Sequence, residues 1–193
     1  MHCWDPDAYS EAWYFATVAH KGQNYGGTKG GEQLPYINHV AEVAAEIMLA
    51  LGSMPQLDND VDGGLNGDLA VMCALLHDTL EDTKVVKHEL VSRFGQDVAD
   101  GVQALSKNET LPKEERMADS LRRIQKEPTE IWMVKMADRI VNLRQPPFYW
   151  SKEKAVEYRE EAKTIYEALQ KAHAGLADRL LQKIDDYQRF IKN

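Results

Sequence analysis

The sequence predicts an all-α protein, a single helical bundle of about eight to ten helices. Apolar residues recur three and four positions apart along most of the chain, which places them on one face of a helix. Glycine and proline separate these segments, and no stretch shows a convincing β-hairpin pattern. The 193 residues fit one domain, from 1 to 193, better than two and suffice for a buried core.

Three helices are expected in the first part of the chain. They cover Asp7–Lys21, Asn38–Ala50 and the apolar segment AVMCALLHDTLEDT, for which Asp68 is the expected N-cap. The glycine-rich stretch GQNYGGTKGGEQLPY separates the first two helices as a loop. Gly52–Gly67 is acidic and rich in glycine, so we expect a surface loop there.

The second part of the chain is punctuated by Gly95, Pro112 and the pair Pro146-Pro147. Between these breaks the same apolar spacing predicts six further helices. They are expected at Val85–Arg93, Gln96–Leu105, Lys113–Lys126, Thr129–Leu143, Lys152–His173 and Gly175–Ile191.

The composition excludes several classes of protein. The net charge of −8 argues against a nucleic-acid-binding surface, which is normally basic. No apolar run approaches the roughly 18 residues of a membrane helix, and the N-terminus lacks the segments of a signal peptide. Cys3 and Cys73 do not form a disulfide framework. These features predict a cytoplasmic protein without a membrane or nucleic-acid partner.

The segment HDTLED, residues 77 to 82, is the main candidate for chemistry. On a continuous helix His77 would lie beside Glu81, and Asp78 beside Asp82, directly after the apolar sequence LAVMCALL. Buried carboxylates need a cation or solvent, and a divalent metal ion meets that need. One histidine and one aspartate are too few ligands, so others must come from elsewhere in the chain.

His39 and Asp138 are the candidates for these further ligands. His39 begins an inward-facing helix, and Asp138 interrupts the apolar helix EIWMVKMADRIVNL, where it shares a stripe with Lys135 and Asn142. Each residue alone has an ordinary structural explanation: a core histidine, or an ion pair between Asp138 and Lys135 or Arg139. The joint pattern favours a functional site.

This arrangement resembles the HD superfamily of metal-dependent phosphohydrolases, and within it the RelA/SpoT-type hydrolase branch, most of all the small alarmone hydrolases. The similarity extends from about residue 8 to residue 170. The matching sequences, in the family's order, are AHKGQ, PYINHVAEVA, ALLHDTLEDT, FGQDVADGVQALS, TLPKEER and VKMADRIVNLR. HDxxEDT together with ADRxxNLR is specific for this branch, whereas a bare His-Asp pair is not.

The resemblance implies roles for individual residues. It implies one metal ion, usually Mn²⁺, bound by His39, His77, Asp78 and Asp138, with Glu81 and Asp82 activating the attacking water. Asn142 matches the asparagine that holds the sugar region of the substrate. Lys113, Lys154 and Tyr158 fall near positions that contact the nucleotide phosphates.

The sequence departs from the family after Gln23. Bacterial members have a basic pair there, whose arginine packs against guanine, whereas this chain has Tyr25 at that position and its nearest cation in sequence is Lys29. A tyrosine can still stack on a purine. The leading expectation is Mn²⁺-dependent removal of the 3′-pyrophosphate from guanosine tetra- or pentaphosphate, (p)ppGpp; an adenosine analogue is also compatible.

Two other functions stay open at this stage. One is a nucleotide phosphomonoesterase, including an NADPH phosphatase, and the other is a non-catalytic nucleotide-binding module. The intact Glu81-Asp82 pair argues against the module. Asp58, Asp60 and Asp62 resemble the start of a calcium loop, but Leu69 stands where that loop needs a bidentate glutamate, so an acidic surface loop is the favoured interpretation.

Overall fold

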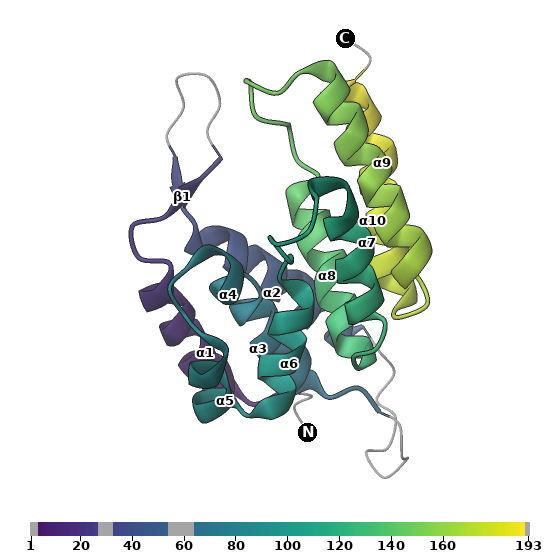
Figure 1. Ribbon diagram of the computed structural model, residues 1–193. Coiled ribbons are helices and arrows are strands. Elements are labelled where there is room, and N and C mark those ends of the chain that lie inside the picture. Colours follow the sequence, from purple (N-terminus) through teal and green to yellow (C-terminus); the bar gives the residue numbers. More distant parts are fainter. Residues whose placement is uncertain (1–3, 27–32, 54–63, 192–193) are drawn as a thin grey trace.

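The computed structural model describes residues 4–26, 33–53 and 64–191, and these form an almost entirely helical bundle (Figure 1). The prediction of an all-α fold is confirmed. The elements are α1 (Pro6–Ala19), β1 (Asn24–Tyr25), β2 (Leu34–Pro35), α2 (Ile37–Gly52), α3 (Gly67–Leu76), α4 (Thr79–Asp82), α5 (Lys87–Phe94), α6 (Gln96–Leu105), α7 (Lys113–Ile124), α8 (Thr129–Asn142), α9 (Lys152–Leu169), α10 (Ala174–Tyr187) and a 3₁₀ turn, η1 (Gln188–Phe190).

Two helices, α3 and α8, form the centre of the core. Eight of the ten residues of α3 are buried, so this helix is enclosed on all sides by α1, α2, α6 and α8. Helix α8 also packs against α9 and α10, which lie side by side along one flank of the bundle in Figure 1. His77 directly follows α3 and Asp138 lies in the second half of α8, so these candidate site residues are attached to the buried centre of the bundle.

The first turn of α3 differs from the prediction. Its N-cap is Asn66, whose side chain accepts a hydrogen bond from the backbone N–H of Leu69 at 3.0 Å. Asp68, the residue predicted for this role, lies inside the helix and accepts a hydrogen bond from the backbone N–H of Asp5 at 2.5 Å. Asp68 thus ties the start of the chain to α3. The prediction of Asp68 as the N-cap was wrong because two suitable capping residues lie two positions apart.

The first predicted loop contains a short antiparallel ladder. Asn24 pairs with Pro35 and Tyr25 with Leu34, so the expectation that the chain has no β-hairpin was wrong. Two residues per strand are too few for an alternating pattern to appear in the sequence. The ladder brings Tyr25 close to the start of α2, which carries His39.

None of the helices in the described ranges is both long and apolar enough to cross a membrane. The predicted acidic calcium-like residues, Asp58, Asp60 and Asp62, lie outside the described residues, as does Lys29.

Candidate active site

The helix that was predicted to run through HDTLED is broken at its functional residues. Helix α3 ends at Leu76 and α4 begins at Thr79, because Asp78 (φ −101°, ψ 1°) leaves the helical conformation. The Thr79 hydroxyl donates to the Leu76 carbonyl at 2.7 Å and satisfies the end of α3. The predicted stacking of His77 on Glu81 was therefore wrong. The break instead brings His77 Nε2 and Asp78 Oδ2 within 2.9 Å of each other.

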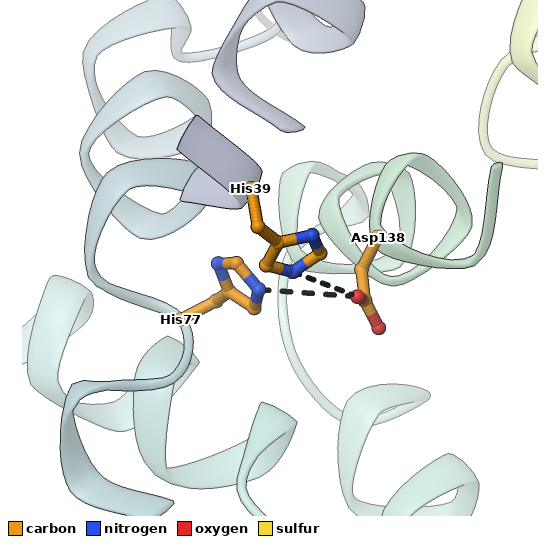
Figure 2. A group of neighbouring side chains, drawn as sticks. All are labelled: His39, His77 and Asp138. Atoms are coloured by element: carbon orange, nitrogen blue, oxygen red, sulfur yellow. Dashed lines mark ion pairs between the residues drawn. The ribbon is translucent and has the colours of Figure 1, made fainter. Parts of the chain in front are cut away.

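Four side chains from three parts of the chain converge at this break. His39 comes from the first turn of α2 and Asp138 from α8. His39 Nε2 lies 3.6 Å from Asp78 Oδ2 and 3.5 Å from Asp138 Oδ1, and His77 Nε2 lies 3.9 Å from Asp138 Oδ1. Figure 2 shows His39, His77 and Asp138 directed toward one point between α2, α3 and α8.

These atoms fit a single metal ion. Ligand atoms about 2.0–2.3 Å from a common ion lie roughly 2.8–3.8 Å from one another in octahedral or tetrahedral geometry, close to the observed distances. His77 Nδ1 lies 2.8 Å from the Ala74 carbonyl, which can only accept a hydrogen bond. Nδ1 therefore carries a proton, which leaves Nε2 as the atom that can bind a metal in the neutral ring. Nε2 is buried and points at the carboxylates of Asp78 and Asp138, as a metal ligand does.

The electrostatics also favour a cation at this point. Burial lowers the pKa of His39, but its hydrogen bonds to Asp138 and Asp78 outweigh burial and raise the pKa to about 9. Burial raises the pKa of Asp138, but Lys135 and His39 hold it well below its usual range. Two largely buried carboxylates thus bind positive charge strongly, and a divalent ion provides that charge while it leaves both histidines neutral.

Neighbouring side chains hold the two aspartates in place. The Tyr36 hydroxyl donates to Asp78 Oδ2. Lys135 Nζ lies 3.1 Å from Asp138 Oδ2, and Asn142 Nδ2 donates to Asp138 Oδ1 at 2.5 Å. The ion pair considered as an ordinary explanation for Asp138 therefore exists, but the Asp138 oxygen on the other side faces the histidines. Lys135 and Asn142 orient this carboxylate toward the site.

Glu81 and Asp82 line the same polar cavity of about 120 Å³ as Asp78 and Asp138. Both carboxylate oxygens of Glu81 bind Lys107: Oε1 lies 2.8 Å from Nζ, and Oε2 accepts from the backbone N–H at 2.9 Å. The Asp82 carboxylate makes no hydrogen bond among the described residues. Partial desolvation, and then the charges of Asp78 and Glu81, raise the pKa of Asp82, so this carboxylate has an increased proton affinity.

A larger cavity of about 730 Å³ adjoins the polar one and shares Asn142 with it. Its lining is rich in apolar residues and includes five aromatic side chains, which are Tyr25 from β1, Phe148 and Trp150 from the segment before α9, Tyr158 from α9 and Tyr187 from α10. A nucleoside fits such a cavity in size and chemistry. Asn142 lies where the phosphate end and the base end of a nucleotide would meet.

The remaining predicted substrate residues differ in their positions. Tyr158 lines the aromatic cavity. Lys154 does not line it, but its Nζ lies 5.7 Å from the ring centre of Trp150, which does. Lys113 is exposed at the start of α7 and lines neither cavity. Lys29 lies in the range 27–32, for which the structure gives no description.

Sequence reasoning missed Tyr36, Lys107 and Arg144. Tyr36 lies three residues before His39 within the quoted sequence PYINHVAEVA, so its position gave a usable signal. Lys107 follows the end of α6, and Arg144 follows the end of α8, where no periodicity indicates which way a side chain is directed. Only the fold shows that they reach the two cavities.

Comparison with known protein families agrees with this geometry. A family profile described as an HD domain matches residues 12–180. The chain belongs to the HD domain family. Two relatives named guanosine-3′,5′-bis(diphosphate) 3′-pyrophosphohydrolase MESH1 are each 32% identical to it. The Xenopus tropicalis protein aligns over 88% of this chain and 89% of its own length, and the Danio rerio protein over 94% and 95%.

The fold of this HD domain is also that of solved relatives. The structure of a metazoan orthologue of SpoT that hydrolyses ppGpp superposes with a TM-score of 0.78 at 24% identity and covers 97% of this chain and 98% of its own. The predicted resemblance to the RelA/SpoT-type hydrolase branch is confirmed by the relatives together with the profile.

Proposed function

We propose that this HD domain is a hydrolase that removes the 3′-pyrophosphate from guanosine tetra- or pentaphosphate, with Mn²⁺ bound by His39, His77, Asp78 and Asp138. The observation that carries the proposal is the convergence of the buried His39 and His77 Nε2 atoms on the carboxylates of Asp78 and Asp138, in the cavity that Glu81 and Asp82 also line. The names of the relatives supply the substrate.

The residues of the polar cavity have different roles in the proposed reaction. His39, His77, Asp78 and Asp138 would hold a divalent ion, which would supply Lewis-acid polarisation of a phosphoryl oxygen and would lower the pKa of water from about 15.7 toward neutrality. Asp82 or Glu81 accepts a proton from the attacking water. The water oxygen bonds to the phosphorus of the 3′-pyrophosphate and the bond from that phosphorus to O3′ breaks. O3′ takes up a proton from solvent to become the 3′-hydroxyl of the nucleotide, and inorganic pyrophosphate leaves. Asn142 holds the sugar between the two cavities.

Substrate binding on this proposal uses both cavities. The pyrophosphate lies in the polar cavity, where Lys107 and Lys135 offset part of its charge. The purine lies among the aromatic side chains of the larger cavity, with Tyr25 offering a ring face. Lys154 and Tyr158 on α9 bind the 5′-phosphates on this proposal.

The test is a product-resolved assay of the purified chain with ppGpp and added Mn²⁺. We expect GDP and inorganic pyrophosphate in equal amounts, with loss of turnover after chelation. Asp138→Asn should abolish turnover, and Asp186→Asn, which alters an exposed carboxylate on α10, is the matched control. Release of orthophosphate would indicate a phosphomonoesterase, and binding without products would indicate a non-catalytic module.

A further inference from the structure

An ion pair at the aromatic cavity joins residues that lie far apart in the sequence. Arg144, which follows α8, contacts Oε2 of Glu42 on α2 through Nη2. The Tyr25 hydroxyl donates to the same carboxylate oxygen at 3.5 Å. Arg144 and Tyr25 both line the cavity of about 730 Å³. Figure 1 shows β1 and the segment that links α8 to α9 at the same end of the molecule.

This cluster lies beside the proposed metal ligands. The ring of Tyr25 lies 5.9 Å from that of His39 and 5.8 Å from that of Tyr36, centre to centre. Asn142 connects the aromatic cavity to the polar one. On the proposed function, on which this inference rests, a nucleotide with its pyrophosphate at the metal site puts its base beside Tyr25 and Arg144.

The ion pair leaves part of the Arg144 guanidinium for a ligand. A guanidinium has five N–H donors in a planar fork, and the contacts of Arg144 within the described residues are with Glu42 and Tyr25. About half of the Arg144 side chain is exposed, at 48%. Glu42 offsets part of its charge and holds the guanidinium at the rim of the cavity through Nη2. The remaining donors suit a ligand edge with two neighbouring acceptors.

Guanine and adenine differ at such an edge. Guanine presents two acceptors, O6 and N7, which an arginine binds in a bidentate manner, whereas adenine presents the N6 amino donor beside N7. We propose that Arg144, positioned by Glu42, binds the O6 and N7 atoms of a guanine stacked on Tyr25 and thereby selects guanine over adenine nucleotides. The opposite edge of guanine, N1 and N2, offers donors and would need a free carboxylate. Glu42 Oε2 already accepts from Arg144 and Tyr25.

Substrate analogues test which edge is bound. The probes are the 3′,5′-bis(diphosphates) of guanosine, adenosine, inosine and 7-deazaguanosine, each assayed with Mn²⁺ for kcat and KM. We expect kcat/KM for guanosine to exceed that for adenosine by roughly 5- to 150-fold, the range of one bidentate base contact. Inosine keeps O6 and N7 and should resemble guanosine, whereas 7-deazaguanosine lacks N7 and should be weaker. A weak inosine substrate would overturn the proposal, because it would show binding at N2.

Variants of the ion pair test the roles of the two residues. Arg144→Ala and Arg144→Lys should both remove the preference for guanosine over adenosine, mainly through KM, because lysine keeps the charge but lacks the fork. Glu42→Gln should lower the preference only in part, since the amide oxygen can still accept from Arg144. If Arg144→Lys keeps the full preference, or Arg144→Ala weakens both substrates equally, the proposal is wrong.

The chain offers a matched control on the same helix. Glu46, one turn after Glu42 on α2, pairs with Arg179 through two contacts of 2.5 Å, and neither residue lines the aromatic cavity. Glu46→Gln should leave the preference unchanged. The dissociation constants of GDP and ADP are measured in parallel because they need no turnover. If the unmodified protein hydrolyses none of the substrates but still binds GDP more tightly than ADP, the proposed function is contradicted and this inference is not. If it hydrolyses ppGpp but binds GDP and ADP equally, this inference is contradicted and the proposed function is not.

Discussion

Glu81 and Asp82 are neighbours in sequence, but their carboxylates have different surroundings. Glu81 is bound at both oxygens by Lys107, whereas the Asp82 carboxylate makes no hydrogen bond in the described part of the chain and its pKa is raised. A general base needs a free oxygen lone pair and a raised proton affinity. Asp82 meets both conditions, and Glu81 is better placed to hold Lys107 beside the phosphates.

Single substitutions at these two residues test this assignment. We expect Asp82→Asn to lower kcat by about 10²–10⁴-fold, the usual contribution of a general base. Glu81→Gln should also lower turnover, but by less, because its amide oxygen can still accept from the Lys107 backbone. Steady-state kinetics with ppGpp and Mn²⁺ measure both effects.

Two controls show whether a loss of turnover comes from the substituted carboxylate itself. Thermal unfolding checks that each variant is folded, and the exposed Asp186→Asn on α10 is the control for loss of a surface charge. Unchanged turnover in Asp82→Asn and Glu81→Gln would remove both residues from the mechanism. A larger loss in Glu81→Gln than in Asp82→Asn would reverse their roles.

At the scale of elements, the sequence predicted most helices well because their signals are local. Helix α6 lies at the predicted residues, and α8 begins at Thr129 as predicted. The break at His77 and Asp78 was not predicted, since it depends on hydrogen bonds from Thr79 and His77 to carbonyls of α3 rather than on a glycine or proline. The sequence predicted the site from its residue types, but it did not predict the break that brings His77 and Asp78 together.

One contact between elements cannot be read from the sequence at all. Gly101 on α6 lies against α3 and α8, and a Cβ atom placed there would lie 2.5 Å from Cδ1 of Ile131 and 3.0 Å from Sγ of Cys73. The sequence gives only a glycine inside a helix. His77 follows α3 and Asp138 lies on α8, so the close packing of α6 against both helices stabilises the backbone that positions these two residues.

Gly101→Ala should therefore destabilise the protein although alanine favours helix. Overpacking a core costs about 1–3 kcal/mol, and the gain in helix propensity offsets up to about 1 kcal/mol of this. We expect a net loss of about 1–2 kcal/mol in the free energy of unfolding, measured by urea denaturation. Gly52→Ala is the control, since no atom lies within 4 Å of its added Cβ and its φ is not positive. Equal stability of both variants would show that Ile131 moves aside without cost.

At the scale of the whole molecule, the four proposed metal ligands come from separate parts of the bundle. His39 lies on α2, His77 and Asp78 lie between α3 and α4, and Asp138 lies on α8. The unfolded chain does not hold these four groups together, so an ion that binds them binds the folded state. Without an ion, Lys135 and His39 offset the charge of Asp138, and a divalent ion adds positive charge that only the folded state can bind at all four groups.

Metal binding should consequently raise the thermal stability of the whole chain. A ligand at 100 times its dissociation constant stabilises the folded state by about 2.7 kcal/mol. For a chain of this length each kcal/mol raises Tm by about 2–4 °C, so saturating Mn²⁺ should raise Tm by roughly 5–11 °C over a chelated sample. Calorimetry with and without chelator measures the shift. Asp138→Asn should lose most of it, because one anionic ligand is gone, whereas Asp186→Asn should keep it. An equal shift in the Asp138→Asn variant would mean that the stabilising ion binds elsewhere in the chain.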